Sequence, residues 1–172
     1  MKKIKLSVFS SGVGSNLLAI HKASIKKNFP GKLNLVVCDK ICPAFKLAKS
    51  LNYETKLISS LDHKKFEALV HDELIKYKID LICLAGFMRI LSPNFVSKWK
   101  NKILNIHHSI LPTYPGLNTH KIVLSNGLKI HGSTVHIVNE KLDSGKILGQ
   151  FAIPVRAVSY THLRAHETPL YL

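Results

Sequence analysis

The chain has 172 residues, of which 46% are hydrophobic, and it carries a formal net charge of +15. This length suits one domain with an ordinary hydrophobic core, and the apolar runs are too short to cross a bilayer. We therefore expect a soluble globular protein without a transmembrane helix or a signal peptide, localised in the cytoplasm.

The large positive charge would suit anionic partners, but its distribution argues against nucleic acid as one of them. The lysines stand in short groups, such as Lys26-Lys27 and Lys64-Lys65, without a long basic block or interleaved aromatic residues. We interpret them as a solvated lysine-rich surface, which would still favour a small anionic substrate.

The cysteines and paired histidines give little support to metal or covalent chemistry. Three cysteines, Cys38, Cys42 and Cys83, cannot all pair, so we expect reduced thiols. The Cys38/Cys42 spacing has no second ligand pair at a matching interval, and His162 and His166 lack the glutamate of an HExxH motif. No serine lies in a nucleophile elbow, so we predict neither a metal site nor a covalent intermediate.

Short β-branched runs alternate with amphipathic segments along most of the chain, which is typical of βαβ units. The predicted fold class is α/β, an open, mostly parallel twisted sheet with helices on both faces. Strands are expected at residues 5–9, 35–38, 55–58, 80–85, 103–107, 133–138 and 147–155, and helices at 15–27, 43–51 and 62–78 and from residue 92.

The clearest helix is the segment 62–78, with Asp62 as its expected N-cap. Its apolar residues recur at steps of three and four, which predicts a stripe facing the core. The stripe consists of Phe66, Leu69, Val70, Leu74 and Ile75.

A glycine-rich turn, Gly12-Val13-Gly14-Ser15-Asn16, lies between the first expected strand and helix. Backbone N–H groups and the helix dipole at such a turn can bind a phosphate. The turn lacks the lysine of a P-loop and the third glycine of a dinucleotide fingerprint. The pattern leaves a purely structural turn and an anion site equally open.

Asn105 and His107 stand two apart on an expected strand, so their side chains project to the same side near its end. A loop with Pro112, Pro115 and Gly116 follows and should be stiff. Ligands of open α/β sheets bind at the carboxyl ends of the strands, so these two residues are candidates for catalysis.

Asp143 lies in an Asp-Ser-Gly turn that follows the strand expected at 133–138. A carboxylate near His107 would favour the imidazolium, which can stabilise a developing oxyanion in acyl transfer. An ordinary turn is the alternative for Asp143 taken alone.

Four ordered segments resemble the family of phosphoribosylglycinamide formyltransferases, and the resemblance runs from about residue 4 to residue 155. The four segments are residues 11–17, which include the glycine-rich turn, Leu84-Ala85-Gly86-Phe87-Met88-Arg89-Ile90-Leu91, Asn105-Ile106-His107 and Leu142-Asp143-Ser144-Gly145. We accordingly expect a formyltransferase catalytic domain at 1–155 with a Rossmann-like fold.

The resemblance implies transfer of a formyl group from 10-formyltetrahydrofolate, as cosubstrate, to the amine of 5'-phosphoribosylglycinamide in purine biosynthesis. Asn105, His107 and Asp143 would be catalytic, without a metal. Gly14, Ser15 and Asn16 would bind the substrate phosphate. The residues implied in folate binding are Lys64, Met88, Arg89, Ile90, Leu91 and Asn105.

The sequence departs from the family pattern at two places. His108 stands where the family usually has proline. Residues 156–172 include SYTHLRAHET, which resembles translated sequencing-adapter sequence, so we interpret this tail as non-native or as the result of a truncation.

Two relatives of the same formyl-folate group are alternatives, formyltetrahydrofolate deformylase and methionyl-tRNA formyltransferase. Both usually carry an additional domain, and the second lacks the Gly-Ser-Asn turn, so both are disfavoured. A non-enzymatic module that binds phosphate or RNA is a third alternative, because of the positive charge. We expect no membrane partner, and a monomer or a homodimer.

Overall fold

The computed structural model describes residues 3–155, which form two compact units, residues 3–91 and residues 92–155. The predicted catalytic domain at 1–155 remains a prediction, and the interpreted tail at 156–172 lies outside the described residues. Within the described part, no helix is both long and apolar enough to span a membrane.

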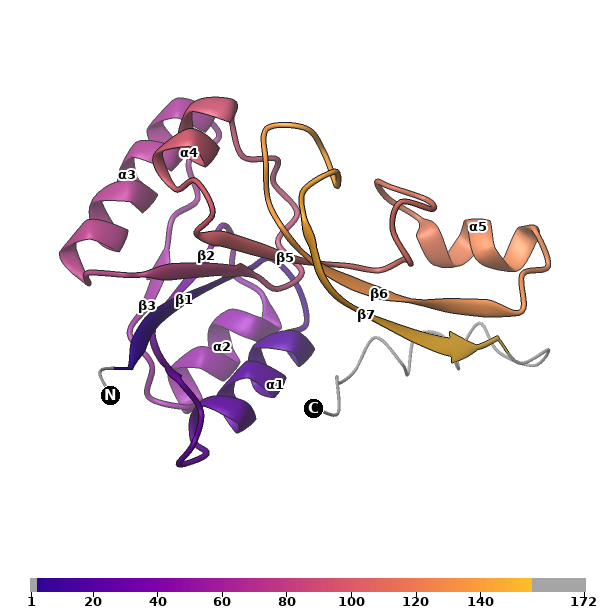
Figure 1. Cartoon of the computed structure of the whole chain (residues 1–172). Helices are drawn as coiled ribbons and strands as arrows, with labels where there is room; N and C mark the ends of the chain where they lie inside the picture. The colour runs from indigo at the N-terminus through magenta and orange to yellow at the C-terminus, as the bar shows by residue number, and fades with distance from the viewer. Residues whose placement is uncertain (1–2, 156–172) are drawn as a thin grey trace. The chain divides into compact units, whose positions relative to one another are not determined.

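Residues 3–91 form a parallel sheet in the strand order β3-β2-β1-β4 (Figure 1). Its strands are β1 (Ile4–Ser10), β2 (Gly31–Cys38), β3 (Thr55–Leu57) and β4 (Leu81–Leu84). Its helices are α1 (Ser15–Ser24), α2 (Pro43–Ser50) and α3 (His63–Lys76). Each strand and helix that the sequence predicts in this region is present, although α1 ends three residues earlier than expected.

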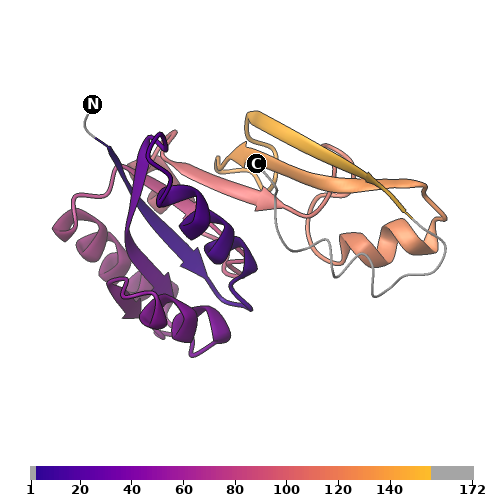
Figure 2. The same cartoon turned by 90° about the horizontal axis from the view of Figure 1, so that it is seen from below.

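Helices cover both faces of this parallel sheet, as predicted (Figure 2). On one face, Leu6 and Val8 of β1 pack in a buried cluster with Leu17 of α1 and Ala44 of α2. On the other face, the ring of Phe9 meets that of Phe87 edge-on at 5.4 Å, and Phe87 stacks on Phe66 of α3 at 6.1 Å. The alternation of side chains along β1 thus joins both helical layers to the sheet.

Asp62 caps α3 as predicted, because its Oδ1 accepts hydrogen bonds from the backbone N–H groups of Lys64 and Lys65 at 2.8 and 3.2 Å. The core stripe is narrower than predicted. Every fourth residue, Phe66, Val70 and Leu74, is buried, whereas Leu69 and Ile75 are exposed, so their assignment to the core was wrong. They lie on the flanks of the row that faces the sheet.

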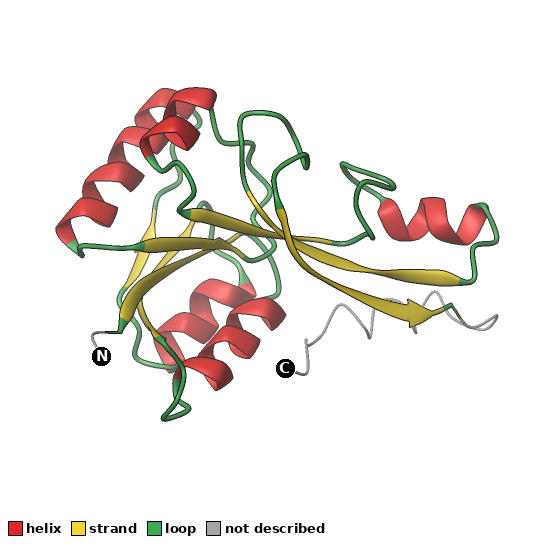
Figure 3. Ribbon diagram, viewed as in Figure 1, coloured by secondary structure: helices red, strands yellow, loops and turns green. Residues whose placement is uncertain are grey.

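Residues 92–155 contain an antiparallel sheet of β5 (Ile103–His107), β6 (Ile130–Ile137) and β7 (Ile147–Pro154) (Figure 3). The helices of this unit are α4 (Pro93–Lys98) and α5 (Thr119–Ser125). The short helix α5 was not predicted. Antiparallel pairing places Asn105 opposite His136 and His107 opposite Thr134.

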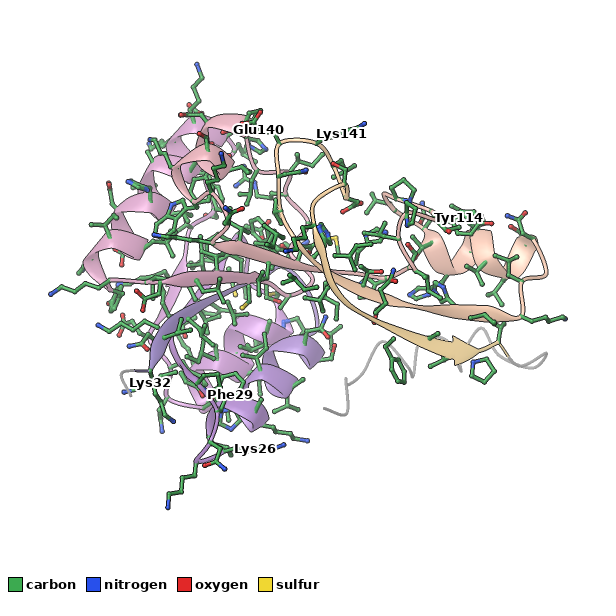
Figure 4. All side chains as sticks on the ribbon, in the orientation of Figure 1. Lys26, Phe29, Lys32, Tyr114, Glu140 and Lys141 are labelled. Carbon is green, nitrogen blue, oxygen red and sulfur yellow. The ribbon has the colours of Figure 1, made fainter. Side chains whose placement is uncertain are left out.

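The lysine-rich surface predicted from the sequence is confirmed for the groups named above. Lys26, Lys27, Lys64 and Lys65 are all exposed, and Lys26 extends into solvent in Figure 4. These charges are therefore hydrated and do not mark a site by themselves.

Candidate functional site

The candidate site residues fall into two groups, one in each compact unit. The residues expected to bind phosphate and folate lie in residues 3–91, apart from Asn105. The residues expected to be catalytic lie in residues 92–155.

His107 ends β5, is only 7% exposed, and has an acceptor at each ring nitrogen. Its Nε2 lies 3.0 Å from the backbone carbonyl of Tyr114, on the loop between β5 and α5 (Figure 4). Its Nδ1 lies 3.4 Å from Oδ2 of Asp143. A neutral imidazole can donate from one nitrogen only, so the imidazolium is the form that satisfies both contacts when Asp143 is ionised.

Asp143 is held by backbone and side-chain contacts together. Its Oδ2 accepts a hydrogen bond from the N–H of Gly116 at 2.9 Å, and its Oδ1 lies 3.6 Å from Nε2 of His136. The backbone of Asp143 has φ +48°, in the left-handed region that aspartate tolerates better than most residues. This turn directs a nearly buried carboxylate at two imidazoles.

Asn105 contacts a residue that the sequence did not single out, His136 of β6. The Nδ2 of Asn105 lies 3.2 Å from Nε2 of His136, while Nδ1 of His136 lies 3.1 Å from the carbonyl of Ile137. A proton on Nδ1 that is donated to Ile137 leaves Nε2 to accept from the amide. His136 thereby fixes the orientation of the Asn105 side chain. One amide hydrogen of Asn105 points to His136, and the other points away from it.

The three predicted catalytic residues and His136 thus form one cluster, which contains an amide, a carboxylate and two imidazoles. The hydroxyl of Ser109 lies 2.6 Å from the Thr113 carbonyl and 3.0 Å from the Tyr114 carbonyl, so its single proton is shared between these two acceptors. When the Nε2–H of His107 turns to a reacting oxygen, the Tyr114 carbonyl therefore retains only a share of the Ser109 proton. Positioned donors of this kind are suited to stabilising an oxyanion.

The glycine-rich turn leads from β1 into α1. Gly14 is the N-cap residue of α1 and has φ +92°. No side chain caps this helix, so an anion at its start would meet the backbone N–H groups of the first turn. A Cβ on Gly14 would lie 2.9 Å from Cα of Ala44, which adds a steric requirement for glycine. The structural and the anion-binding interpretations of this turn are therefore compatible.

Ser11 joins this turn to the segment expected to bind folate. Its hydroxyl accepts a hydrogen bond from the N–H of Met88 at 3.0 Å, and its own N–H donates to the carbonyl of Gly86 at 3.1 Å. Two segments 77 residues apart in the sequence therefore share one anchor. The serine was not predicted as a functional residue.

The expected folate-binding residues differ in their environment. Met88 and Ile90 are exposed large apolar side chains, at 60% and 69%. The guanidinium of Arg89 lies 4.1 Å above the ring of Phe66 and donates to the carbonyl of Ser60 at 2.9 Å. Leu91 is half-buried, and Lys64 is exposed on the first turn of α3.

A hollow of about 490 Å³ lies elsewhere in the first unit. It is lined by Lys56, Leu57, Ile58, Ser59, Ser60, Lys65, Leu69 and Glu73. None of the residues expected to bind ligands lines it, and Lys56 is already paired with Glu54 and Glu73 at 3.2 and 3.5 Å. We therefore do not assign the substrates to this hollow.

Another pair of histidines, buried His131 and half-buried His120, lies in the same unit as the cluster of Asn105, His107, His136 and Asp143. Nδ1 of His120 is 2.6 Å from Nε2 of His131. Burial, with a smaller effect of the nearby imidazoles of His120, His108 and His107, lowers the pKa of His131 to about 4. His131 is therefore neutral in the folded chain at pH 7.

This lowered pKa predicts a loss of stability in acid. Between pH 6.5 and pH 4 an unfolded His131 binds a proton that the folded side chain does not. Neutral His131 therefore contributes to the free energy of unfolding. We expect this contribution to be complete above pH 6.5 and to fall by about 3 kcal/mol or less as the pH drops to 4. Urea unfolding at several pH values, with His131→Gln for comparison, measures it. Parallel pH curves for the two proteins would contradict the expectation.

Comparisons with known proteins place the chain in a family. Residues 4–167 match the model of the formyl transferase family. The chain is 41% identical to phosphoribosylglycinamide formyltransferase of Escherichia coli, over 90% of this chain and 74% of that protein. It is 42% identical to the trifunctional purine biosynthetic protein adenosine-3 of Gallus gallus, of which it spans only 16%.

Solved structures agree with this result. The phosphoribosylglycinamide formyltransferase of Brucella melitensis superposes with a TM-score of 0.88, at 35% identity, over 96% of this chain and 91% of that one. The fold class is α/β with a mostly parallel sheet, which confirms the prediction. The chain belongs to the formyl transferase family.

Proposed function

We propose that the chain transfers the formyl group of 10-formyltetrahydrofolate to the amine of 5'-phosphoribosylglycinamide, a step of purine biosynthesis. The observation that carries the proposal is the cluster of Asn105, His107 and Asp143, because it provides donors for an oxyanion and a source of a proton. Family membership and the likeness to the Escherichia coli enzyme support the choice of substrates.

In the proposed reaction the amine lone pair attacks the formyl carbon and forms a C–N bond. Negative charge develops on the formyl oxygen, where the free amide hydrogen of Asn105 and an N–H of His107 would stabilise it. The bond from the formyl carbon to the folate nitrogen then breaks. His107 would supply a proton to that nitrogen, and the proton lost by the amine would restore the imidazolium.

Asp143 would act through His107 by keeping the imidazolium charged and correctly oriented. The amides that follow Gly14, together with Ser15 and Asn16, would bind the substrate phosphate at the start of α1. Lys64 and residues Met88 to Leu91, with Asn105, would contact the folate. We further propose that the protein acts in the cytoplasm as a monomer or a homodimer.

A test of the proposal compares three reactions of the purified chain with 10-formyltetrahydrofolate. One contains phosphoribosylglycinamide, one contains methionyl-tRNA, and one contains no acceptor. Mass spectrometry measures the formylated product and absorbance measures the folate product. We expect turnover only with phosphoribosylglycinamide. Equal consumption of the donor without an acceptor would instead identify a deformylase, and formylation of the tRNA would identify the other alternative.

His136 supplies a prediction for the same assay. His136→Phe keeps a ring in the buried position but removes the nitrogen next to Asn105 and Asp143. We expect kcat to fall about two- to tenfold, because the lost hydrogen bond to the Asn105 amide joins neutral groups and is worth about 0.5–1.5 kcal/mol. His136→Gln, which can still contact the amide, should recover part of the rate. Unchanged kcat in His136→Phe would exclude this positioning role.

A further inference from the structure

Cys38 and Cys42 approach each other below the glycine-rich turn. Cys38 is the last residue of β2 and Cys42 is the N-cap of α2, so the connection of Asp39 to Ile41 turns the chain back between them. Both belong to the buried cluster between the sheet and α1 and α2, with exposures of 0% and 7%. The two thiols are close enough that Cys42 raises the pKa of Cys38.

We propose that Cys38 and Cys42 are a redox modification site that forms a reversible disulfide and thereby alters the glycine-rich turn. Both thiols are free in this structure. A disulfide holds its sulfurs about 2.05 Å apart, so closing it draws the start of α2 toward the end of β2. Such cytosolic disulfides serve as redox sensors more often than as structural staples.

The chemistry proceeds by thiol–disulfide exchange with a small disulfide such as oxidised glutathione. The sulfur of Cys42, the more exposed of the two, attacks one glutathione sulfur and releases one glutathione thiol. The sulfur of Cys38 then attacks that of Cys42 and releases the second. The two cysteines lose two protons and two electrons, and the glutathione disulfide is reduced to two thiols.

Burial, together with the neighbouring Cys42, raises the pKa of the Cys38 thiol to about 12. The thiolate is the attacking form, so closure should be slow at pH 7 and should accelerate about tenfold per pH unit up to pH 9. An exposed thiol, with an ordinary pKa of about 8.5, gains little thiolate above pH 9, whereas closure by Cys38 should continue to accelerate from pH 9 to pH 10.

Ala44, two residues after Cys42, transmits the change to the glycine-rich turn. Its N–H donates to the carbonyl of Gly12 at 3.1 Å, and its Cα lies against Gly14. Movement of Cys42 therefore displaces a residue that touches the turn at two points. If the turn binds the substrate phosphate, which rests on the proposed function, oxidation should raise KM for that substrate several-fold and leave kcat nearly unchanged.

The test oxidises the folded full chain with glutathione disulfide and digests it with trypsin under non-reducing conditions. Cleavage after Lys40 separates the two cysteines, so a disulfide joins peptide 33–40 to peptide 41–46. We expect this cross-linked pair in the wild type and in Cys83→Ala, its loss on reduction, and its absence in Cys42→Ser. Serine is a good N-cap residue, so that variant should fold.

Two readouts separate this proposal from the proposed function. Cross-linking is measured by mass and needs no activity, so a chain without formyl transfer can still pass it. Inorganic phosphate, added to the reduced and oxidised chains in a thermal-shift assay, reports on the turn without substrate. A glutathione adduct without the cross-link, or a cross-link that changes neither the phosphate-induced shift nor KM, would overturn the proposal.

Discussion

Replacement of His107 by alanine is expected to lower kcat/KM for formyl transfer by about two to four orders of magnitude, the range for loss of a positioned acid–base group. The variant removes both the group that would stabilise the oxyanion and the source of the proton for the folate nitrogen. Steady-state kinetics with both substrates measures the effect. We expect it mainly in kcat, because neither the expected phosphate turn nor the expected folate segment contains this residue.

The fold should tolerate this replacement. Without His107, Asp143 still accepts from the N–H of Gly116, and the Tyr114 carbonyl shares the proton of Ser109 with the Thr113 carbonyl. The carboxylate keeps a full partner and the carbonyl keeps a shared one, so we expect the loss of stability to stay within about 1–3 kcal/mol. His71→Ala on α3, in the other unit, serves as the matched control. A decrease of less than tenfold in His107→Ala, with normal folding, would contradict the catalytic assignment.

Much of the fold could be predicted because its signals are local. Strands of β-branched residues, the Asp62 cap and the first-turn prolines of α2 and α4 lie within a few residues of the elements they define. Helix α5 has no comparable signal. It is seven residues long, mixes histidine and lysine with apolar residues, and follows Asn118, an N-cap residue whose side chain makes no capping hydrogen bond. Its position therefore depends on tertiary packing.

The candidate site was predictable to the extent that its residues share one strand or one turn. Asn105 and His107 stand two apart on β5, so a strand assignment alone directs them to the same side. His136 joins them only through the antiparallel register that sets it opposite Asn105. No local pattern in the sequence fixes this register.

The link between Ser11 and Met88 was missed for a related reason. It joins the ends of β1 and β4, which are separated by most of the first unit in sequence but pair in parallel. The sequence indicates that both turns lie at the same edge of the sheet. It does not indicate which hydroxyl joins them, because that depends on the conformation of each turn.

Gly145 is a position where one added methyl group should damage both stability and activity. A Cβ at Gly145 would lie 1.7 Å from the carbonyl oxygen of Ile137 and 2.9 Å from its carbonyl carbon. These are backbone atoms at the end of β6, where the N–H of Ile137 donates to Lys146 at 2.9 Å. A side-chain rotation cannot relieve the overlap, so the turn from β6 to β7 must move.

We expect Gly145→Ala to lower the free energy of unfolding by about 3 kcal/mol or more, which corresponds to a fall of about 6–12 °C in Tm. Movement of this turn also displaces Asp143, two residues earlier, and shifts Ile137 next to His136. The contact of 3.4 Å between His107 and Asp143 should therefore be lost. We expect kcat/KM to fall by about 100-fold even where the variant remains folded.

Gly149→Ala on β7 is the matched control, because a Cβ there meets no atom within 4 Å. The two variants make the same chemical change in one unit, and only the first meets backbone atoms. Thermal unfolding and steady-state kinetics on both should separate the steric effect from the general effect of replacing a strand glycine, which is small. Equal stability and activity in the two variants would show that the turn can absorb the methyl group, and that Asp143 does not depend on the close approach of Gly145 to Ile137.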